Sequence, residues 1–251
     1  MLRKFGIEGI YVIHAKKGYE YHEQRLRTIL DSFNLECEFV TEGDPSLFSK
    51  IDLERYFTPE VLSRYSPGTI SCTLNHIISY EKIVANKNKY AIIFENDPFF
   101  IGDFLQKIIP ITKKADLLEP GFIVSLENTT LQFPSFWQTC KNKYLYPASC
   151  GRCAGAYLID FAAAKAALES LETDKCNDVI DWWHNRLINR GILKMYWAHP
   201  PLTEQGSHNG MLSSTISSNR KSLQRRILWD IQKLFKQYIR RLAKQKRLIQ
   251  P

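Results

Sequence analysis

The sequence contains no apolar run long enough to cross a membrane. A membrane-spanning helix needs about 20 consecutive, predominantly apolar residues, and no stretch of this 251-residue chain reaches that length. The first residues, MLRKFGIE, also lack the apolar block of about 7–15 residues that a secretory signal contains. We therefore expect a cytoplasmic protein.

Motifs that bind dinucleotides or ATP are also missing. The chain contains neither a Gly-x-Gly-x-x-Gly fingerprint nor a Walker-type loop, which counts against an unrelated α/β enzyme that uses those cofactors. Its 6 cysteines, in a chain without a secretory signal, are expected to be reduced thiols. Cys150 and Cys153 form a lone C-x-x-C pair. Because no second pair matches it, we do not expect zinc or redox chemistry there.

The positive charge of the chain is confined to one end. The formal net charge is +8, yet residues 219–251 contain 11 basic side chains against one acid, Asp230. Residues 1–218 therefore hold 23 basic and 25 acidic groups and are close to neutral. A basic surface for a nucleic-acid duplex is accordingly not expected on the body of the protein.

Strand-like and helix-like apolar patterns alternate along residues 9–197. Within residues 9–41 they form a βαβ pattern, which implies parallel strands and a right-handed crossover. Strands are predicted over 9–14, 36–41, 90–94, 121–126, 154–159 and 193–197, the last of the chain, and helices over 21–33, 69–85, 104–109, 161–171 and 177–189, with short helices in 42–68. We predict an α/β fold with a mostly parallel sheet flanked by helices.

Residues 90–98, YAIIFENDP, carry the first candidate site. A buried strand stops at Glu95, and side chains two apart on an extended chain point the same way, so Glu95 and Asp97 are expected to project together. Pro98 favours an extended conformation for Asp97. Two carboxylates at a strand end suit a hard divalent cation such as Mn²⁺ or Mg²⁺. Solvated loop residues or helix caps would give the same pattern.

Five segments in order resemble glycosyltransferase family 25 of lipopolysaccharide biosynthesis. They are residues 10–17 with 23–25, GTISCTLNH at 68–76, END at 95–97, GAYLI at 155–159, and the HPP, Gln205 and SSTI residues of 199–216. The sequence departs from the family pattern at Ser71, Asn75 and Asn96. Asn96 matters most, because it replaces an Asp and so removes one negative charge beside the proposed metal.

The resemblance implies a GT-A-like, Rossmann-type fold and the inverting transfer of a hexose, often galactose, from a UDP-sugar to lipooligosaccharide or another surface glycan. The residues it assigns to the nucleotide sugar are His14, Arg25, Asn75, His76, Gly155 and Gln205. The metal ligands would be Glu95, Asp97 and His208, with Mn²⁺ or Mg²⁺ as the ion. For His76, a hydrogen-bonded histidine of the core is the alternative.

Inversion requires a base that removes the proton of the acceptor hydroxyl. Asp181 is the first candidate, because it lies beside Trp182 and Trp183, which could stack on sugar rings. Asp178 is the second, although a carboxylate in the first turn of the predicted 177–189 helix is also explained by the helix dipole. Glu127, at the end of the 121–126 strand, is the reserve.

The basic end of the chain is predicted to form a separate element. Apolar residues recur at helical spacing from Leu223 to Leu242 with Lys and Arg between them. We therefore expect a basic amphipathic helix in residues 219–251, behind a catalytic domain of residues 1–218. Such a helix favours an anionic membrane surface, which would place the enzyme on the inner face of the inner membrane. A protein partner, including a second copy of the chain, and a nucleic acid are the weaker alternatives.

A second function is compatible with the same residues. Because Asn96 weakens the acidic pattern, the chain could be a catalytically weak or silent member of the family. Such a protein would bind a sugar nucleotide or act as a scaffold.

Overall fold

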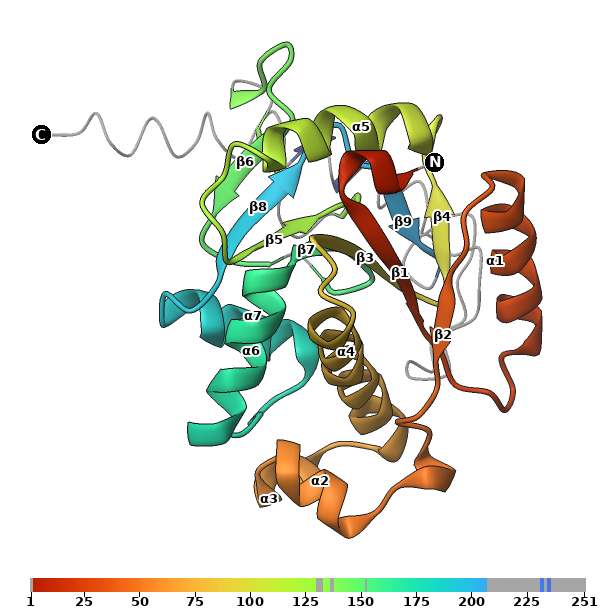
Figure 1. The fold of residues 1–251 in the computed structure, drawn as a ribbon, viewed down its shortest axis with the longest axis vertical. Helices are drawn as coiled ribbons and strands as arrows, with labels where there is room; N and C mark the ends of the chain where they lie inside the picture. Colours follow the sequence, from red (N-terminus) through yellow and green to blue (C-terminus); the bar gives the residue numbers. More distant parts are fainter. Residues whose placement is uncertain are drawn as a thin grey trace, which may run out of the picture.

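A sheet of seven strands forms the centre of the protein (Figure 1). The computed structural model describes residues 2–129, 133–135, 138–151, 153–206, 231–232 and 234–235. In these residues the strand order is β2-β1-β3-β7-β5-β8-β6. The strands are β1 (Ile7–Ile13), β2 (Glu38–Val40), β3 (Tyr90–Glu95), β5 (Phe122–Ser125), β6 (Leu145–Ala148), β7 (Ala156–Asp160) and β8 (Lys194–Ala198).

Most strands of this sheet run in the same direction. β1 is parallel to both β2 and β3, and β5 is parallel to β8. β7 lies antiparallel between β3 and β5, and β6 lies antiparallel beside β8. Because β7 is antiparallel to both of its neighbours, β3 and β5 run in the same direction. The strands that share this direction are β1, β2, β3, β5 and β8. The predicted mostly parallel sheet is confirmed, and the arrangement is consistent with a Rossmann-like fold.

Helices cover both faces of the sheet. They are α1 (Glu20–Ser32), α2 (Lys50–Tyr56), α3 (Pro59–Arg64), α4 (Pro67–Ala85), α5 (Phe104–Ala115), α6 (Phe161–Thr173) and α7 (Ile180–Asn189), with short 3-10 helices η1 (Leu2–Phe5) and η2 (Pro45–Leu47). On one face α4, α6 and α7 share a core with Ile93, and on the other α1 and α5 share a core with Ile92. Neighbouring residues of β3 thus enter opposite cores, which is why its sequence is apolar throughout.

The helix predicted to end at Pro110 continues beyond it. α5 includes Pro110 in its interior and runs on to Ala115. A proline there cannot donate a hydrogen bond to the preceding turn, but Phe104, Ile108 and Ile111 form a buried stripe on the same helix. Burial of this stripe favours the helical path on both sides of the proline and outweighs its local cost.

Two further predictions at the end of the chain are corrected. α7 begins at Ile180 after an extended Val179, so Asp178 precedes the helix and Asp181 occupies its first turn. β8 is not the last strand, because β9 (Thr203–Gln205) follows it and pairs with β4 (Pro98–Phe100) in a separate antiparallel sheet. β4 directly continues the chain from Asp97, so this small sheet lies next to the candidate metal site.

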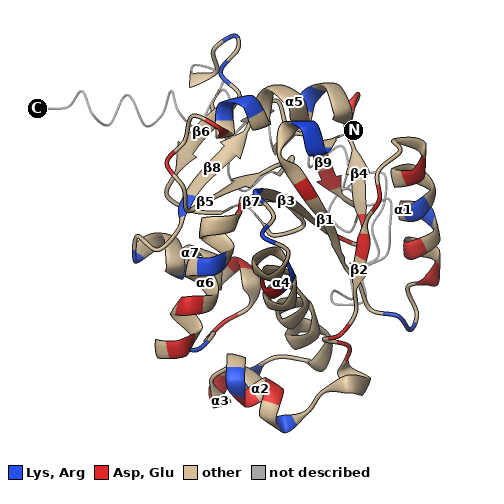
Figure 2. Ribbon diagram, viewed as in Figure 1, with Lys and Arg blue, Asp and Glu red and all other residues tan. Residues whose placement is uncertain are grey.

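Basic and acidic residues are mixed along helices such as α1 and α2 (Figure 2). This mixture matches the near-neutral charge of residues 1–218. Most of the predicted basic helix, residues 219–251, lies outside the described residues, and in its described part Ile231, Leu234 and Phe235 are exposed. Within the described residues, no helix is both long and apolar enough to cross a membrane.

Candidate active site

Polar side chains gather where β1 and β3 end. The two strands are parallel with Ile13 opposite Glu95, so His14 and the acidic run of residues 95–97 leave the sheet at one edge. The carboxyl edge of an open α/β sheet is where ligands bind in such folds. A pocket of about 440 Å³ lies there, lined by Ile13, His14, Ala15, Tyr19, Pro45, Ser66, Gly68, Ser71, Cys72, Asn75, Glu95 and Asn96.

Glu95 is contacted by three side chains from two other elements. Gln205 of β9 donates a hydrogen bond from Nε2 to Oε2 at 3.2 Å, while Cys72 Sγ and His76 Nε2 of α4 each lie 3.8 Å from Oε1. Burial, and then the charge of Asp97, raise the pKa of Glu95 to about 8. A divalent cation between the carboxylates would relieve this repulsion and displace the proton. The residues present therefore fit a hard cation.

Asp97 is fixed in place by the small sheet. Its side chain is buried, and its backbone carbonyl accepts a hydrogen bond from the amide of Gly206 at 2.9 Å. Arg25 of α1 donates to the carbonyl of Pro98 at 2.9 Å and lies over the ring of Phe99. Arg25 therefore braces the segment after Asp97, and its guanidinium supplies positive charge close to that carboxylate.

Asn96, the departure from the acidic pattern, contacts His14. The two side chains meet at 3.3 Å between Nδ2 and Nδ1, and the other ring nitrogen of His14 lies 3.2 Å from Oε2 of Glu23. Burial lowers the pKa of His14, so a neutral ring can accept from the Asn96 amide. An aspartate at 96 would instead bring a third carboxylate to Glu95 and Asp97.

Asn75 of α4 organises the loops beside the pocket. Its Oδ1 accepts a hydrogen bond from the amide of Gly43 at 2.7 Å, and its Nδ2 donates to the carbonyl of His14 at 3.4 Å. The amide therefore joins the end of β1 to the loop that follows β2.

Gly155 brings Gln205 and Glu127 together behind Glu95. Its carbonyl accepts the backbone hydrogen bond of Glu95 at 2.8 Å. A Cβ at position 155 would lie 2.1 Å from Gln205 Nε2 and 2.5 Å from Glu127 Oε1. Only glycine leaves room for both side chains, which explains the residue at this position. Glu127 is buried here, within the same group of residues as Gln205.

The structure separates the two aspartates proposed as the base. Asp178 accepts hydrogen bonds from the Tyr65 hydroxyl at 2.5 Å and the Val179 amide at 2.8 Å, so it ties α3 to the start of α7. Asp181 instead lies close enough to Glu95 to feel its charge. Burial, and then the charge of Glu95, raise its pKa to about 7. Of the neighbouring tryptophans, Trp182 is exposed, but Trp183 belongs to the core and is not available to a sugar.

A buried chain of hydrogen bonds was not predicted from the sequence. His76 Nδ1 meets the Tyr157 hydroxyl at 2.7 Å, which meets the Tyr80 hydroxyl at 2.8 Å, which meets His184 Nε2 at 2.5 Å. Burial lowers the pKa of both histidines to about 3, with His76 adding to the effect at His184. The sequence held a signal for part of this hydrogen-bond chain. Cys72, His76 and Tyr80 are spaced one helical turn apart, which places them on one face of α4.

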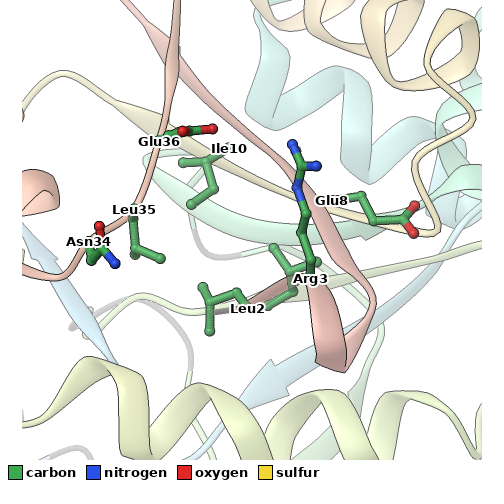
Figure 3. A pocket seen from close by; sticks show the side chains of 9 residues that line it. Leu2, Arg3, Glu8, Ile10, Asn34, Leu35 and Glu36 are labelled. Carbon is green, nitrogen blue, oxygen red and sulfur yellow. The ribbon is translucent and has the colours of Figure 1, made fainter.

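His208, the third proposed metal ligand, lies outside the described residues. A separate hollow of about 370 Å³ surrounds the start of β1, near Arg3, Glu8 and Glu36 (Figure 3). It lies at the opposite end of β1 from His14, so it is not part of the candidate site.

Comparison with known proteins supplies an independent observation. The model of "Glycosyltransferase family 25 (LPS biosynthesis protein)" matches residues 9–179. A "Glycosyltransferase 25 family member" of Aedes aegypti is 24% identical in an alignment of 241 positions that covers 86% of this chain and 39% of that protein. A "Putative glycosyltransferase" of Haemophilus influenzae is 24% identical in an alignment of 195 positions that covers 70% of this chain and 66% of that protein. The chain thus spans less than two thirds of either relative.

Proposed function

The chain belongs to glycosyltransferase family 25, and from this premise we propose that it transfers a hexose from a UDP-sugar to lipooligosaccharide or another surface glycan. Galactose is the first candidate for the sugar, and the transfer inverts the anomeric carbon. The observation that supports this most is the electrostatic coupling of Glu95, Asp97 and Asp181 beside a pocket at the carboxyl edge of the sheet. The coupled carboxylates provide both a cation site and a base.

In the proposed reaction, Glu95 and Asp97 hold Mn²⁺ or Mg²⁺, with His208 as a further candidate ligand. The bound cation supplies positive charge for the departing diphosphate. Gln205 orients Glu95 through its hydrogen bond, and Arg25 braces the segment after Asp97. His14, Asn75 and His76 shape the donor side of the site from β1 and α4, while Gly155 allows Gln205 to approach.

Asp181 is the proposed base. Its carboxylate takes the proton of the acceptor hydroxyl while that oxygen bonds to the anomeric carbon and the bond from this carbon to the diphosphate breaks, so that UDP leaves. A pKa of about 7 suits this role, because the carboxylate is available near neutral pH and still accepts a proton readily. Trp182, exposed beside it, offers an aromatic face for the acceptor sugar. Glu127, buried behind Glu95, remains the reserve.

The second candidate function is a weak or silent sugar-nucleotide-binding member of the family. The contact of Asn96 with His14 supports it, because the site then holds one carboxylate fewer than the family pattern. We also propose that the basic segment 219–251 places the enzyme peripherally on the inner face of the inner membrane, where a lipid-linked acceptor would be accessible.

Purified protein incubated with a panel of UDP-sugars and Mn²⁺ tests the proposal, with UDP release as the readout, first without and then with a lipooligosaccharide acceptor. The wild type is expected to release UDP from one sugar, faster with the acceptor. Asp181→Asn should reduce acceptor-dependent turnover by at least about a hundredfold, the usual worth of a general base, and leave UDP affinity unchanged.

Asp178→Asn is the matched control, because its amide oxygen can still accept from Tyr65 and it lies outside the coupled group. It should retain most of the activity. Loss of turnover in Asp178→Asn with normal turnover in Asp181→Asn would reverse the assignment. Tight UDP-sugar binding without any turnover in the wild type would favour the silent alternative.

A further inference from the structure

Three side chains of different chemistry converge on one point beside the candidate active site. Cys72 and His76 lie one turn apart on α4, and Glu95 ends β3 opposite them. One ligand atom from each, the sulfur, a ring nitrogen and a carboxylate oxygen, lies within 4.8 Å of the other two. The sulfur of Cys72 and Nε2 of His76 are both 3.8 Å from Oε1 of Glu95.

These separations fit a tetrahedral zinc site. Zinc binds sulfur at about 2.3 Å and nitrogen or oxygen at about 2.0–2.2 Å, so ligand atoms around it stand about 3.4–3.6 Å apart. The two separations from Oε1 of Glu95, 3.8 Å each, exceed this by a few tenths of an ångström, and the sulfur of Cys72 and the ring nitrogen of His76 lie within 4.8 Å of each other. Side-chain rotations can close these gaps. Three protein ligands would leave the fourth position open, as in zinc sites that bind water or a substrate group.

The histidine is prepared for such a role by its buried surroundings. His76 is fully buried, and its Nε2, the atom that faces Glu95, has no hydrogen-bond partner. On the other side of the ring, Nδ1 meets the Tyr157 hydroxyl at 2.7 Å. If Nδ1–H donates to Tyr157, the hydroxyls of Tyr157 and Tyr80 can each donate onward, and His184 Nε2 accepts at the end.

With the protons arranged in this direction, each donor and acceptor along the hydrogen-bond chain is paired. A lone pair then remains free on Nε2 of His76. A hydrogen bond donated by the other ring nitrogen, as here to Tyr157, fixes the tautomer of a metal-binding histidine and raises its basicity. An unpartnered Nε2 in a fully buried ring is otherwise costly.

We propose that Cys72, His76 and Glu95 bind a thiophilic divalent cation of the Zn²⁺ type, at a position distinct from the hard-cation pair of Glu95 and Asp97. When the cation binds, the thiol proton of Cys72 and the proton held by the Glu95 carboxyl leave to solvent. Because Glu95 belongs to both sites, Zn²⁺ and the hard cation compete for this carboxylate. That competition rests on the proposed function, whereas binding of Zn²⁺ does not.

The test uses Co²⁺ as a spectroscopic substitute for Zn²⁺ on the full-length, metal-stripped protein. Wild type should develop a thiolate-to-Co²⁺ charge-transfer band with visible bands of tetrahedral type, and Zn²⁺ should abolish both. Cys72→Ser should lose the charge-transfer band, while Cys37→Ser, which removes another half-buried free thiol, should keep it. Tyr157→Phe should weaken Co²⁺ binding about 10- to 100-fold without removing the band, because it removes the hydrogen-bond partner of the metal-binding histidine.

Absence of the band in folded wild type overturns the proposal, and so does an unchanged band in Cys72→Ser. Circular dichroism of each variant separates lost binding from lost folding. Because the spectrum needs no sugar nucleotide, failure of the transfer assay leaves this result unaffected, and zinc binding can fail while transfer succeeds.

Discussion

His184 shows how the surroundings of one residue change its chemistry. The sequence places it between Trp183 and Asn185 on a helix, where a solvated histidine would be unremarkable. In the structure it is buried at the end of the Tyr157–Tyr80 hydrogen-bond chain, and burial lowers its pKa from 6.5 to about 3. The folded protein therefore keeps this ring neutral at pH values where the unfolded chain protonates it.

We expect His184→Gln to flatten the acid dependence of stability. Between pH 6.5 and about 3 the unfolded chain binds one more proton at His184 than the folded protein, so the free energy of unfolding falls as pH is lowered through this window. Each such histidine contributes a slope of about 1.4 kcal/mol per pH unit. Above pH 6.5 the slope from this residue vanishes. Glutamine keeps an acceptor for Tyr80 and does not titrate.

Urea unfolding at several pH values from 7 to 4.5 measures the two slopes. The wild type should lose stability more steeply than His184→Gln, while His76 contributes equally to both. Equal slopes of the free energy of unfolding against pH in the two proteins would show that His184 is protonated in the folded protein or exposed before global unfolding.

At the scale of elements, α5 shows tertiary packing overriding a local signal. Pro110 predicts a helix end, because it lacks a donor and its ring crowds the preceding turn. The helix nevertheless continues, since the residues on both sides of the proline belong to one buried stripe. The start of α7 also differs from the prediction. Val179 is extended, so Asp178 precedes the helix and binds Tyr65, while Asp181 lies in its first turn, within reach of the charge of Glu95.

Pro110→Ala should therefore stabilise the protein. Alanine restores the amide donor and relieves the clash within α5, so the free energy of unfolding is expected to rise by about 1–3 kcal/mol. Lys113→Ala, an exposed substitution in the same helix, should change it by less than about 0.5 kcal/mol. Chemical denaturation of the three proteins provides the comparison. A destabilised Pro110→Ala would mean that the proline kink is required for packing.

At the scale of the whole molecule, charge separates the body from the end of the chain. Residues 219–251 carry 11 of the 34 basic side chains, although the body is near neutral. Side chains that approach an anionic surface contribute about 1 kcal/mol each. If residues 219–251 lie on an anionic surface, as we propose, several of these side chains together would hold the protein there.

Flotation with anionic and neutral vesicles tests this attachment. The full chain should float with anionic vesicles at low salt and be released by high salt, because the attraction is screened. A chain ending at residue 218 should remain in the soluble fraction, with circular dichroism confirming its fold. Equal flotation of both chains on anionic vesicles would contradict the membrane proposal and direct attention to a protein partner.

The sequence alone determined the class of fold, because alternating periods and doubly buried strands leave few other arrangements. It also marked the edge of the sheet at residues 95–97, since the apolar pattern of the strand stops there in two acidic side chains. The resemblance to family 25 came from five segments in order, and the match of the family model to residues 9–179 confirmed it. These features are local or periodic, so neighbouring residues suffice to specify them.

Only the tertiary structure decided which distant side chains meet. It coupled Asp181 rather than Asp178 to Glu95, reversed β7 between two strands of common direction, and joined Cys72 and His76 to Glu95. Such contacts depend on how α4, α7 and the sheet pack. Many sequences with the same spacing of apolar residues could pack these elements in another arrangement. The positions of the acids were readable in the chain, but their pKa values and partners arise from the fold that buries them.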